Sequence, residues 1–371
     1  MQYASIRSWR YAATGEKMIE VQPQRIVIRC PNWVGDLVMC TPALRSVRRH
    51  FPAAHISVIV KPSLRAVIEE LPFFDEIIEY EPKGRNRGFK NYISFINNLR
   101  KQQFDLGILM PNSFSSGLVF YLAAVPDRIG YNRNARGWML TRRVTPFRDG
   151  GKIVPVNMVR LYLELVKQLG CPAVDGRVEL KTSASAEQWA DSFFSGHGIA
   201  GSDLSVVMIP GATFGSSKCW KDSSFAEVAD ALISEYGARV FIVPGPGEAD
   251  IAHSIRIKMN QPPVDMGSGI LPLDRLMALI RRSTLLITND TGPRHFGVAF
   301  DKPVIVLMGP TDPRYTDYGL DKTLILRGDA DCAPCHLKTC PIDHRCMTLI
   351  APQKVLTAAR EMIEKYNLIV R

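Results

Sequence analysis

The chain has 371 residues, which at about 150 residues per domain is enough for two domains. Its composition, 46% hydrophobic and 22% charged, excludes collagenous, largely disordered and coiled-coil proteins. The 46 Lys and Arg exceed the 36 Asp and Glu, and the resulting charge of +10 favours polyanions such as nucleic acid, anionic lipid or phosphorylated metabolites, without choosing among them.

Residues 1–24 are predicted to form an N-terminal extension. This segment lacks the continuous apolar stretch of a signal peptide, and no apolar run in the chain reaches the roughly 18 residues of a spanning helix. We therefore expect a cytoplasmic protein with no transmembrane segment. Met18 lies seven residues before the first predicted strand, so the sequence leaves open whether translation starts at Met1 or at Met18.

Short apolar runs alternate with helical patterns from Arg25 onward. The runs lie at 25–30, 55–60, 76–80 and 105–110, and the helices are predicted at about 35–49, 63–71, 88–103 and 113–124. Strands that alternate with helices predict a mainly parallel sheet covered by helices on both faces. Residues 25–180 are therefore interpreted as a doubly wound α/β domain.

The same pattern restarts after a polar stretch, residues 181–203, which we interpret as a linker. Strands are predicted at 205–209, 238–243, 285–288 and 303–308, and helices at 223–236, 248–259, 273–282 and 292–299. Residues 204–350 thus predict a second doubly wound domain, and residues 351–371 hold a closing helix at about 352–366. Ligands bind beyond the carboxyl ends of such strands, so two facing domains create a cleft between them.

The loop after the first predicted strand, Pro31–Asp36, places a carboxylate before a helix, facing the expected cleft. Asp36 is a candidate base there. The alternative is that Asp36 caps the helix, which is a common role for Asp at such a position.

The loop after the strand at 205–209 contains glycines, hydroxyl side chains and one lysine, Lys218. Backbone N–H groups can approach a phosphate closely in such a loop, and a cation offsets its charge. The order of residues is neither that of a P-loop nor that of a dinucleotide-binding fingerprint. A flexible turn with a solvated lysine is the alternative.

Two further strand ends carry polar side chains. Asn289–His295 opens a helix and offers Thr291 and His295 as donors, although Asp290 or Thr291 as a helix cap explains the segment as well. Glu248 follows another strand, where it either binds ribose hydroxyls or begins a helix.

Four cysteines lie within 15 residues near the end of the second domain: Cys332, Cys335, Cys340 and Cys346. Four thiolates can hold a tetrahedral zinc ion, but the second pair has loose spacing, so reduced and packed thiols are the preferred interpretation. No metal site is predicted.

The stretch from Arg128 to Lys152 contains seven basic residues and one acidic residue. This charge suits a phosphorylated acceptor or an anionic membrane surface, and a solvated cationic loop explains it as well. Aromatic residues are sparse here and no nucleic-acid motif accompanies them, so nucleic acid is not an expected partner.

The segments Pro31–Arg48, Pro210–Trp220 and Asn289–Phe300, followed by the cysteine segment, stand in an order that resembles the ADP-heptose:lipopolysaccharide heptosyltransferases, especially the heptosyltransferase II group. The resemblance covers nearly the whole chain from Arg25 onward. It implies a GT-B architecture, with an acceptor-binding first domain, a nucleotide-sugar-binding second domain, and a final helix able to return to the first domain.

The resemblance also implies roles for single residues. Asp36 matches the family's proposed general base, Thr213 and Lys218 its diphosphate ligands, and Glu248 its ribose contact. Asp290, Thr291, Gly292 and His295 fall on the donor-binding motif, in which Pro293 departs from the usual Leu or Met and leaves the placement of Arg294 open. The expected partners are ADP-heptose and a phosphorylated lipid A-core acceptor at the inner membrane surface, with no cofactor and no divalent cation.

The implied chemistry is an inverting transfer, in which a carboxylate takes the proton of the acceptor hydroxyl and fixed donors stabilise the leaving diphosphate. Two alternatives stay open. A nucleotide-sugar epimerase can share the architecture, although the cleft loops lack a matching set of acids and histidines. A non-catalytic nucleotide-sugar binding protein would need the second-domain residues and not Asp36.

Overall fold

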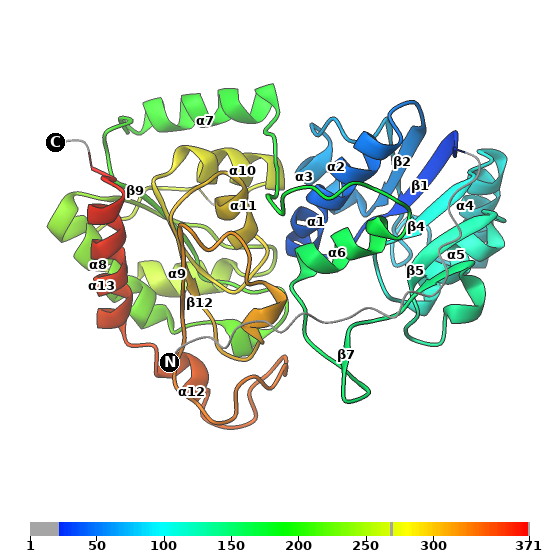
Figure 1. The fold of residues 1–371 in the computed structure, drawn as a ribbon. Coiled ribbons are helices and arrows are strands. Elements are labelled where there is room, and N and C mark those ends of the chain that lie inside the picture. The colour runs from blue at the N-terminus through cyan, green and yellow to red at the C-terminus, as the bar shows by residue number, and fades with distance from the viewer. Residues whose placement is uncertain (1–21, 268–269, 370–371) are drawn as a thin grey trace.

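The computed structural model describes residues 22–267 and 270–369. Most of the predicted N-terminal extension, including Met18, lies outside the described residues. Two α/β domains, each built on one parallel sheet, lie side by side with the chain passing once from the first to the second (Figure 1). The α/β fold class predicted from the sequence is confirmed.

The first domain contains a six-stranded parallel sheet in the order β3-β2-β1-β4-β5-β6. The strands are β1 (Arg25–Arg29), β2 (His55–Val60), β3 (Glu76–Glu79), β4 (Leu106–Leu109), β5 (Asp127–Tyr131) and β6 (Arg142–Val144). The direction of winding reverses between β1 and β4, and this switch point opens a crevice at their carboxyl ends. The loop that carries Asp36 follows β1 directly.

Helices cover both faces of this sheet because successive strand side chains point to opposite faces. Ile26 and Ile28 of β1 pack under α1 (Val34–Met39), α2 (Thr41–His50), η1 (Pro62–Leu64), α3 (Arg65–Ile68) and α6 (Met158–Lys167), whereas Val27 packs under α4 (Phe89–Lys101) and α5 (Phe114–Leu122). The single helix predicted at 35–49 is two helices. Pro42 explains the break, since proline is tolerated in the first turn of α2 and not inside a helix.

The second domain contains a five-stranded parallel sheet in the order β10-β9-β11-β12-β13. The strands are β9 (Ser205–Ile209), β10 (Arg239–Ile242), β11 (Leu285–Asn289), β12 (Val304–Leu307) and β13 (Thr323–Leu326). Its helices are η3 (Ser216–Lys218), α8 (Asp222–Tyr236), α9 (Ala249–Arg256), α10 (Leu273–Arg282), α11 (Arg294–Ala299), η4 (Pro313–Tyr315), α12 (Arg345–Thr348) and α13 (Pro352–Lys365). The switch point lies between β9 and β11, where the loops that carry Lys218 and Asp290 begin.

The predicted linker, residues 181–203, contains a helix that its polar composition did not indicate. Helix α7 (Ala184–Gly196) is capped by the Ser183 side chain, and its small residues Ala186 and Ala190 pack against Ala278 of α10. Glu187 pairs with Arg281 and Arg282 at the same contact, at 2.6 and 3.1 Å. The stretch is therefore packed on the second domain rather than extended between the domains.

The final helix, α13, does not return to the first domain as the resemblance implied. Its apolar face is buried in the second-domain core against α8. Arg360 also pairs with Glu235 of α8 at 2.6 Å. The apolar face of α13 is already buried within the second domain, which explains why the helix stays there.

The basic stretch from Arg128 to Lys152 is less uniform than the sequence suggested. Arg136 is fully buried and donates to the carbonyls of Pro111 and Tyr131, and Arg142 pairs with Asp127 at 2.8 Å. Two short strands, β7 (Arg148–Asp149) and β8 (Lys152–Ile153), form an exposed ribbon. The alternative of a solvated cationic loop is therefore wrong for Arg136, whose guanidinium is buried against backbone carbonyls.

The two domains meet through the ends of their helices. Helix α1 packs against α11, and α3 packs against α10. A Cβ added at Gly292 would lie 2.7 Å from Cβ of Val34, so a glycine is needed where the two chains approach. Within the described ranges, no helix has the length and hydrophobicity needed to cross a membrane.

Candidate active site

A cavity of about 840 Å³ lies between the two domains. All eight residues singled out from the sequence line it: Asp36, Thr213, Lys218, Glu248, Asp290, Thr291, Gly292 and His295. They follow the carboxyl ends of β1, β9, β10 and β11. Three of these strands, β1, β9 and β11, lie at the two switch points, and β10 is the neighbour of β9. The topology thus brings together side chains that are more than 250 residues apart in the sequence.

Asp290 is the centre of a buried ionic network. Its Oδ2 accepts from Lys218 Nζ at 2.6 Å and from Thr311 Oγ1 at 2.6 Å, and its Oδ1 accepts from Arg294 at 2.7 Å. Burial by itself would raise the pKa of Asp290, but the charges of Arg294 and Lys218 outweigh it and hold the pKa well below its ordinary value. This carboxylate therefore stays ionised and orients the Lys218 ammonium at the cavity wall.

His295 lies beside this network with its ring stacked on Tyr318, the two centroids 5.6 Å apart. Its Nδ1 is 2.5 Å from the Tyr318 hydroxyl. Burial, followed by the charge of Arg294, lowers the pKa of His295 well below its ordinary value, so the imidazole is neutral. Its other edge faces Gly35 of the first domain, where only a glycine leaves room for the ring.

Asp36 faces the cavity from the first turn of α1. Trp33 occupies the cap position, and no side chain caps α1, so the capping role considered from the sequence does not apply. Burial raises the pKa of Asp36 to about 6, and the charge of Lys218 across the cavity opposes that shift. A carboxyl group with this pKa is ionised at neutral pH and can still take up a proton.

Glu248 is packed between the loops after β9 and β10. Its Oε2 accepts a hydrogen bond from Gly245 N at 2.7 Å, and it lies so close to Gly211 that a Cβ there would overlap its carboxylate. Burial raises the pKa of Glu248, while N–H groups of Gly245 and Ala212 act against that shift. The carboxylate is thus fixed at the cavity edge. Thr213 lies exposed on the neighbouring loop.

The cysteine segment braces the loop that carries Lys218. Ser217 N and Oγ donate to the carbonyls of Lys338 and Leu337 at 3.1 and 2.5 Å, and the His344 ring contacts Ser217 O at 2.6 Å. Cys332 and Cys335 are exposed and Cys346 is buried. Across the described part of the chain, no group of three or more His, Cys, Asp or Glu side chains is arranged to hold a metal ion.

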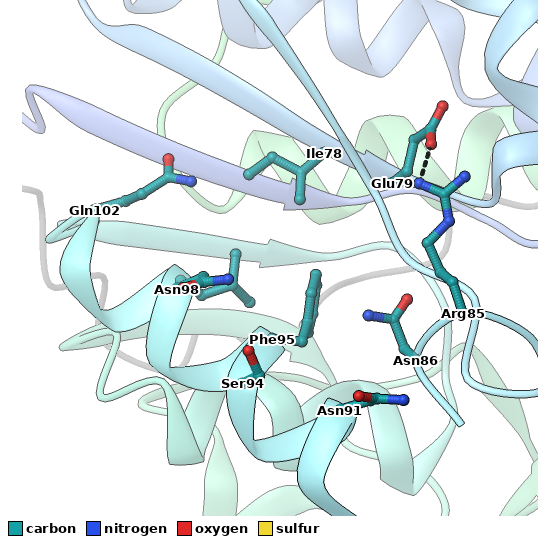
Figure 2. A pocket seen from close by; sticks show the side chains of 10 residues that line it. Ile78, Glu79, Arg85, Asn86, Asn91, Ser94, Phe95, Asn98 and Gln102 are labelled. Carbon is teal, nitrogen blue, oxygen red and sulfur yellow. Dashed lines mark ion pairs between the residues drawn. The ribbon is translucent and has the colours of Figure 1, made fainter. Parts of the chain in front are cut away.

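A second, smaller hollow of about 390 Å³ lies between β3 and α4 on the first domain (Figure 2). Four amide side chains, Asn86, Asn91, Asn98 and Gln102, are among its lining residues, and Arg85 pairs with Glu79 at 2.5 Å in its wall. None of the residues singled out from the sequence lines this hollow. The interdomain cavity is therefore the candidate active site.

Several residues of this site were not found from the sequence. Thr311 and Tyr318 follow β12 and complete the surroundings of Asp290 and His295. His336 also lines the cavity. The position of Thr311 a few residues after a predicted strand was a sequence signal that could have placed it in the site. Tyr318 and His336 lie in irregular loops and carry no such signal.

Replacing Gly35 by Ala tests the contact between the two domains. The new Cβ would lie 2.5 Å from Cδ2 and 2.7 Å from Nε2 of His295, so the domains must separate or the ring must leave Tyr318. Overpacking of this kind costs about 1–3 kcal/mol, and we expect a lower melting temperature and weaker nucleotide binding. Gly196, where an added Cβ meets nothing within 4 Å, supplies the control substitution to Ala. Equal behaviour of the two variants would show that the domains do not meet in this way.

Comparison with known proteins gives a consistent result. A family model described as "Glycosyltransferase family 9 (heptosyltransferase)" matches residues 92–346. The chain is 27% identical over 316 residues to lipopolysaccharide heptosyltransferase 2 of Escherichia coli, covering 82% of this chain and 88% of that protein. The Escherichia coli ADP-heptose lps heptosyltransferase II structure is 25% identical with a TM-score of 0.73, covering 92% of this chain and 99% of that one.

A second solved structure, a glycosyl transferase of family 9 from Veillonella parvula, superimposes with a TM-score of 0.79. It is 22% identical and covers 94% of this chain and 99% of that chain, and the similarity concerns the fold. Both structures have the GT-B architecture that the resemblance implied, which is confirmed for this chain.

Proposed function

Because the chain belongs to glycosyltransferase family 9, the heptosyltransferases, we propose that it moves a heptose from ADP-heptose to the inner core of lipopolysaccharide. The observation that carries the proposal is the interdomain cavity, which places one carboxylate with a raised pKa on the first domain opposite a fixed lysine on the second. The first domain would receive the acceptor and the second the nucleotide sugar.

The donor would lie along the loops of the second domain. Thr213 and Lys218 would bind the diphosphate, together with the N-terminal end of α11 at Thr291 and Gly292. Glu248 would accept hydrogen bonds from the ribose hydroxyls. Asp290 has all its strong donors from the protein, so its proposed role is to hold Lys218 in place rather than to touch the donor.

The proposed reaction is an inverting displacement at the anomeric carbon. Asp36 takes the proton from the acceptor hydroxyl as its oxygen forms the new glycosidic bond, and the bond to ADP breaks on the opposite face. Negative charge then grows on the leaving diphosphate, where Lys218 and Thr213 are already in position to stabilise it. His295, as a neutral imidazole, can donate a hydrogen bond in the cavity without adding a proton-transfer step.

The acceptor is proposed to be a phosphorylated lipid A-core glycolipid at the inner surface of the membrane. A positively charged first domain suits such a ligand. Family membership speaks for sugar transfer over epimerisation. A buried first-domain carboxylate with a raised pKa, opposite the proposed donor-binding loops, speaks against a protein that only binds the nucleotide sugar.

Release of ADP from ADP-heptose tests this proposal when it is followed with and without truncated lipopolysaccharide. We expect release to depend on the acceptor, with only slow hydrolysis in its absence. Rapid consumption of the donor with no dependence on acceptor would oppose the transfer function. A parallel reaction with a uridine diphosphate sugar tests the choice of nucleotide.

We expect transfer to persist in EDTA, because Lys218 lines the cavity beside the proposed diphosphate site and the part of the chain that the structure describes holds no group of three or more His, Cys, Asp or Glu side chains arranged for a metal ion. The initial rate in EDTA should equal the rate in added magnesium. Loss of activity that magnesium restores would contradict the mechanism. A lower melting temperature at an unchanged rate would instead assign a structural metal to the cysteine segment.

A further inference from the structure

Three aromatic side chains form an exposed strip on the outer side of α5. Phe114, Tyr121 and Trp138 are 43%, 44% and 55% exposed. The Trp138 ring lies between the other two, with centroid distances of 6.4 Å to Phe114 and 5.1 Å to Tyr121. Single exposed apolar residues are ordinary on a protein surface, but three packed rings form a continuous patch that calls for a partner.

A buried cation holds this aromatic strip in place. Arg136 is fully buried, contacts the carbonyls of Pro111 and Ser113 and the hydroxyl of Ser116, and thereby ties the start of α5 to η2 (Gly137–Met139), which carries Trp138. The strip is therefore built on two elements that are fixed to each other. A preorganised surface loses little conformational entropy on binding.

Positive charge lies beside the strip. The Arg128 guanidinium lies over the Tyr121 ring, 5.6 Å from its centroid. Arg133 lies close enough to Arg136 for its charge to contribute to lowering the pKa of that buried group, after burial itself. Aromatic rings with cations beside them suit the interface of an anionic bilayer, where the rings enter the headgroup layer and the cations meet phosphates.

A second cationic and aromatic element stands on the same face of the first sheet. Helices α4 and α5 pack beside each other over one core cluster (Figure 1). Helix α4 begins at Phe89 after β3, and α5 begins at Phe114 after β4. Because the strands are parallel, both phenylalanines lie toward the carboxyl edge of the sheet. Phe89 is 79% exposed, and Lys83, Arg87 and Lys90 around it are exposed as well.

The excess charge of the protein belongs to this domain. Residues 25–180 contain 23 Lys and Arg against 13 Asp and Glu, a balance of +10, whereas residues 181–371 contain 20 against 21, a balance of −1. A partner that selects the first domain by charge must itself be anionic. A protein partner would be recognised by aromatic residues as well, but it would not require a whole domain of one sign.

We propose that the strip of Phe114, Tyr121 and Trp138, together with Phe89, docks the first domain onto an anionic phospholipid bilayer. This proposal rests on the proposed function only in that a lipid-anchored acceptor gives the docking a purpose. The surface overlaps the basic stretch singled out in the sequence, since Arg128 and Trp138 belong to that stretch, but here the rings insert and the cations assist. Docking through these helices turns the face of the first sheet opposite α1 toward the membrane, with Phe89 and Phe114 at the carboxyl edge from which the Asp36 loop also starts.

Co-sedimentation with vesicles tests the docking without acceptor or donor. We expect the wild-type protein to bind vesicles of phosphatidylglycerol and phosphatidylcholine at least tenfold more tightly than vesicles of phosphatidylcholine alone. Trp138→Ser, alone and combined with Phe114→Ser, should weaken this binding at least fivefold. Ile257→Ser is the matched control, since Ile257 is 68% exposed on the second domain.

Quenching by brominated lipid shows directly whether the ring enters the bilayer. We expect tryptophan fluorescence to be quenched in the wild type and in Ile257→Ser, and the quenching to be lost in Trp138→Phe. ADP affinity and the rate of transfer to a detergent-dispersed acceptor report separately on folding and on the proposed function. Vesicle binding that is equal in all variants, or a Trp138-dependent self-association without vesicle binding, would overturn the proposal.

Discussion

Replacing Asp36 by Asn is expected to lower the rate of heptose transfer by about a hundred- to ten-thousandfold while ADP affinity stays close to that of the wild type. The amide keeps the size of the side chain and cannot take the acceptor proton. The group lies on α1 of the first domain and is not among the residues proposed to bind the nucleotide. Transfer followed by acceptor mass, with ADP binding followed by calorimetry, separates the two effects.

Asp250→Asn serves as the control, because Asp250 is exposed at the start of α9. A rate for Asp36→Asn above about a tenth of the wild-type value corresponds to a barrier change of only ~1.4 kcal/mol, which is too small for loss of a general base. That result would show that Asp36 has a structural role and is not the general base.

The pH dependence of kcat/KM gives a second view of the same group. Because burial raises the pKa of Asp36 to about 6, the carboxylate form is lost as the pH falls through 6. We expect kcat/KM to be level above this pH and to fall about tenfold per pH unit below it. A profile that stays level to pH 5 would show that a different group accepts the proton.

Replacing Lys218 by Ala is expected to weaken ADP binding and to slow turnover by a further hundred- to thousandfold. Its charge faces a diphosphate whose negative charge grows in the transition state, so the loss in kcat adds to the loss in affinity. Lys221→Ala is the control, because Lys221 lies exposed three residues further along the same loop. Unchanged ADP affinity in Lys218→Ala would remove Lys218 from the donor site.

Replacing Lys218 by Ala is also expected to change the pKa of Asp36. The Lys218 charge lowers the pKa of Asp36 against the effect of burial. Its removal should therefore move the acid limb of the pH profile to higher pH. A limb that does not move would mean that the two groups do not face each other across the cavity.

The strand ends explain why so much of the candidate site could be predicted from the sequence. Buried strands are short apolar runs, and Asp36, Lys218 and Asp290 follow three of them by six, nine and two residues. In parallel sheets such positions gather at one edge, so local patterns are sufficient to place these side chains in one cleft.

The parts that could not be predicted depend on contacts between distant segments. Tyr318 belongs to the site only because β12 and its loop bring it to His295, and no local pattern marks it. Arg136 belongs to a basic stretch, and it is buried because its guanidinium donates hydrogen bonds to backbone carbonyls of a neighbouring loop. Helix α7 was hidden by its polar composition, since two alanines are enough to pack it on α10.

The measurement that tests the central claim most directly is the structure of the acceptor after incubation with ADP-heptose. Mass spectrometry reports whether truncated lipopolysaccharide gains a sugar, and NMR reports the anomeric configuration of the new bond. The account predicts the gain of one heptose per ADP released, with the configuration inverted relative to the donor. An unchanged acceptor in the presence of consumed donor, or a product with retained configuration, would contradict it.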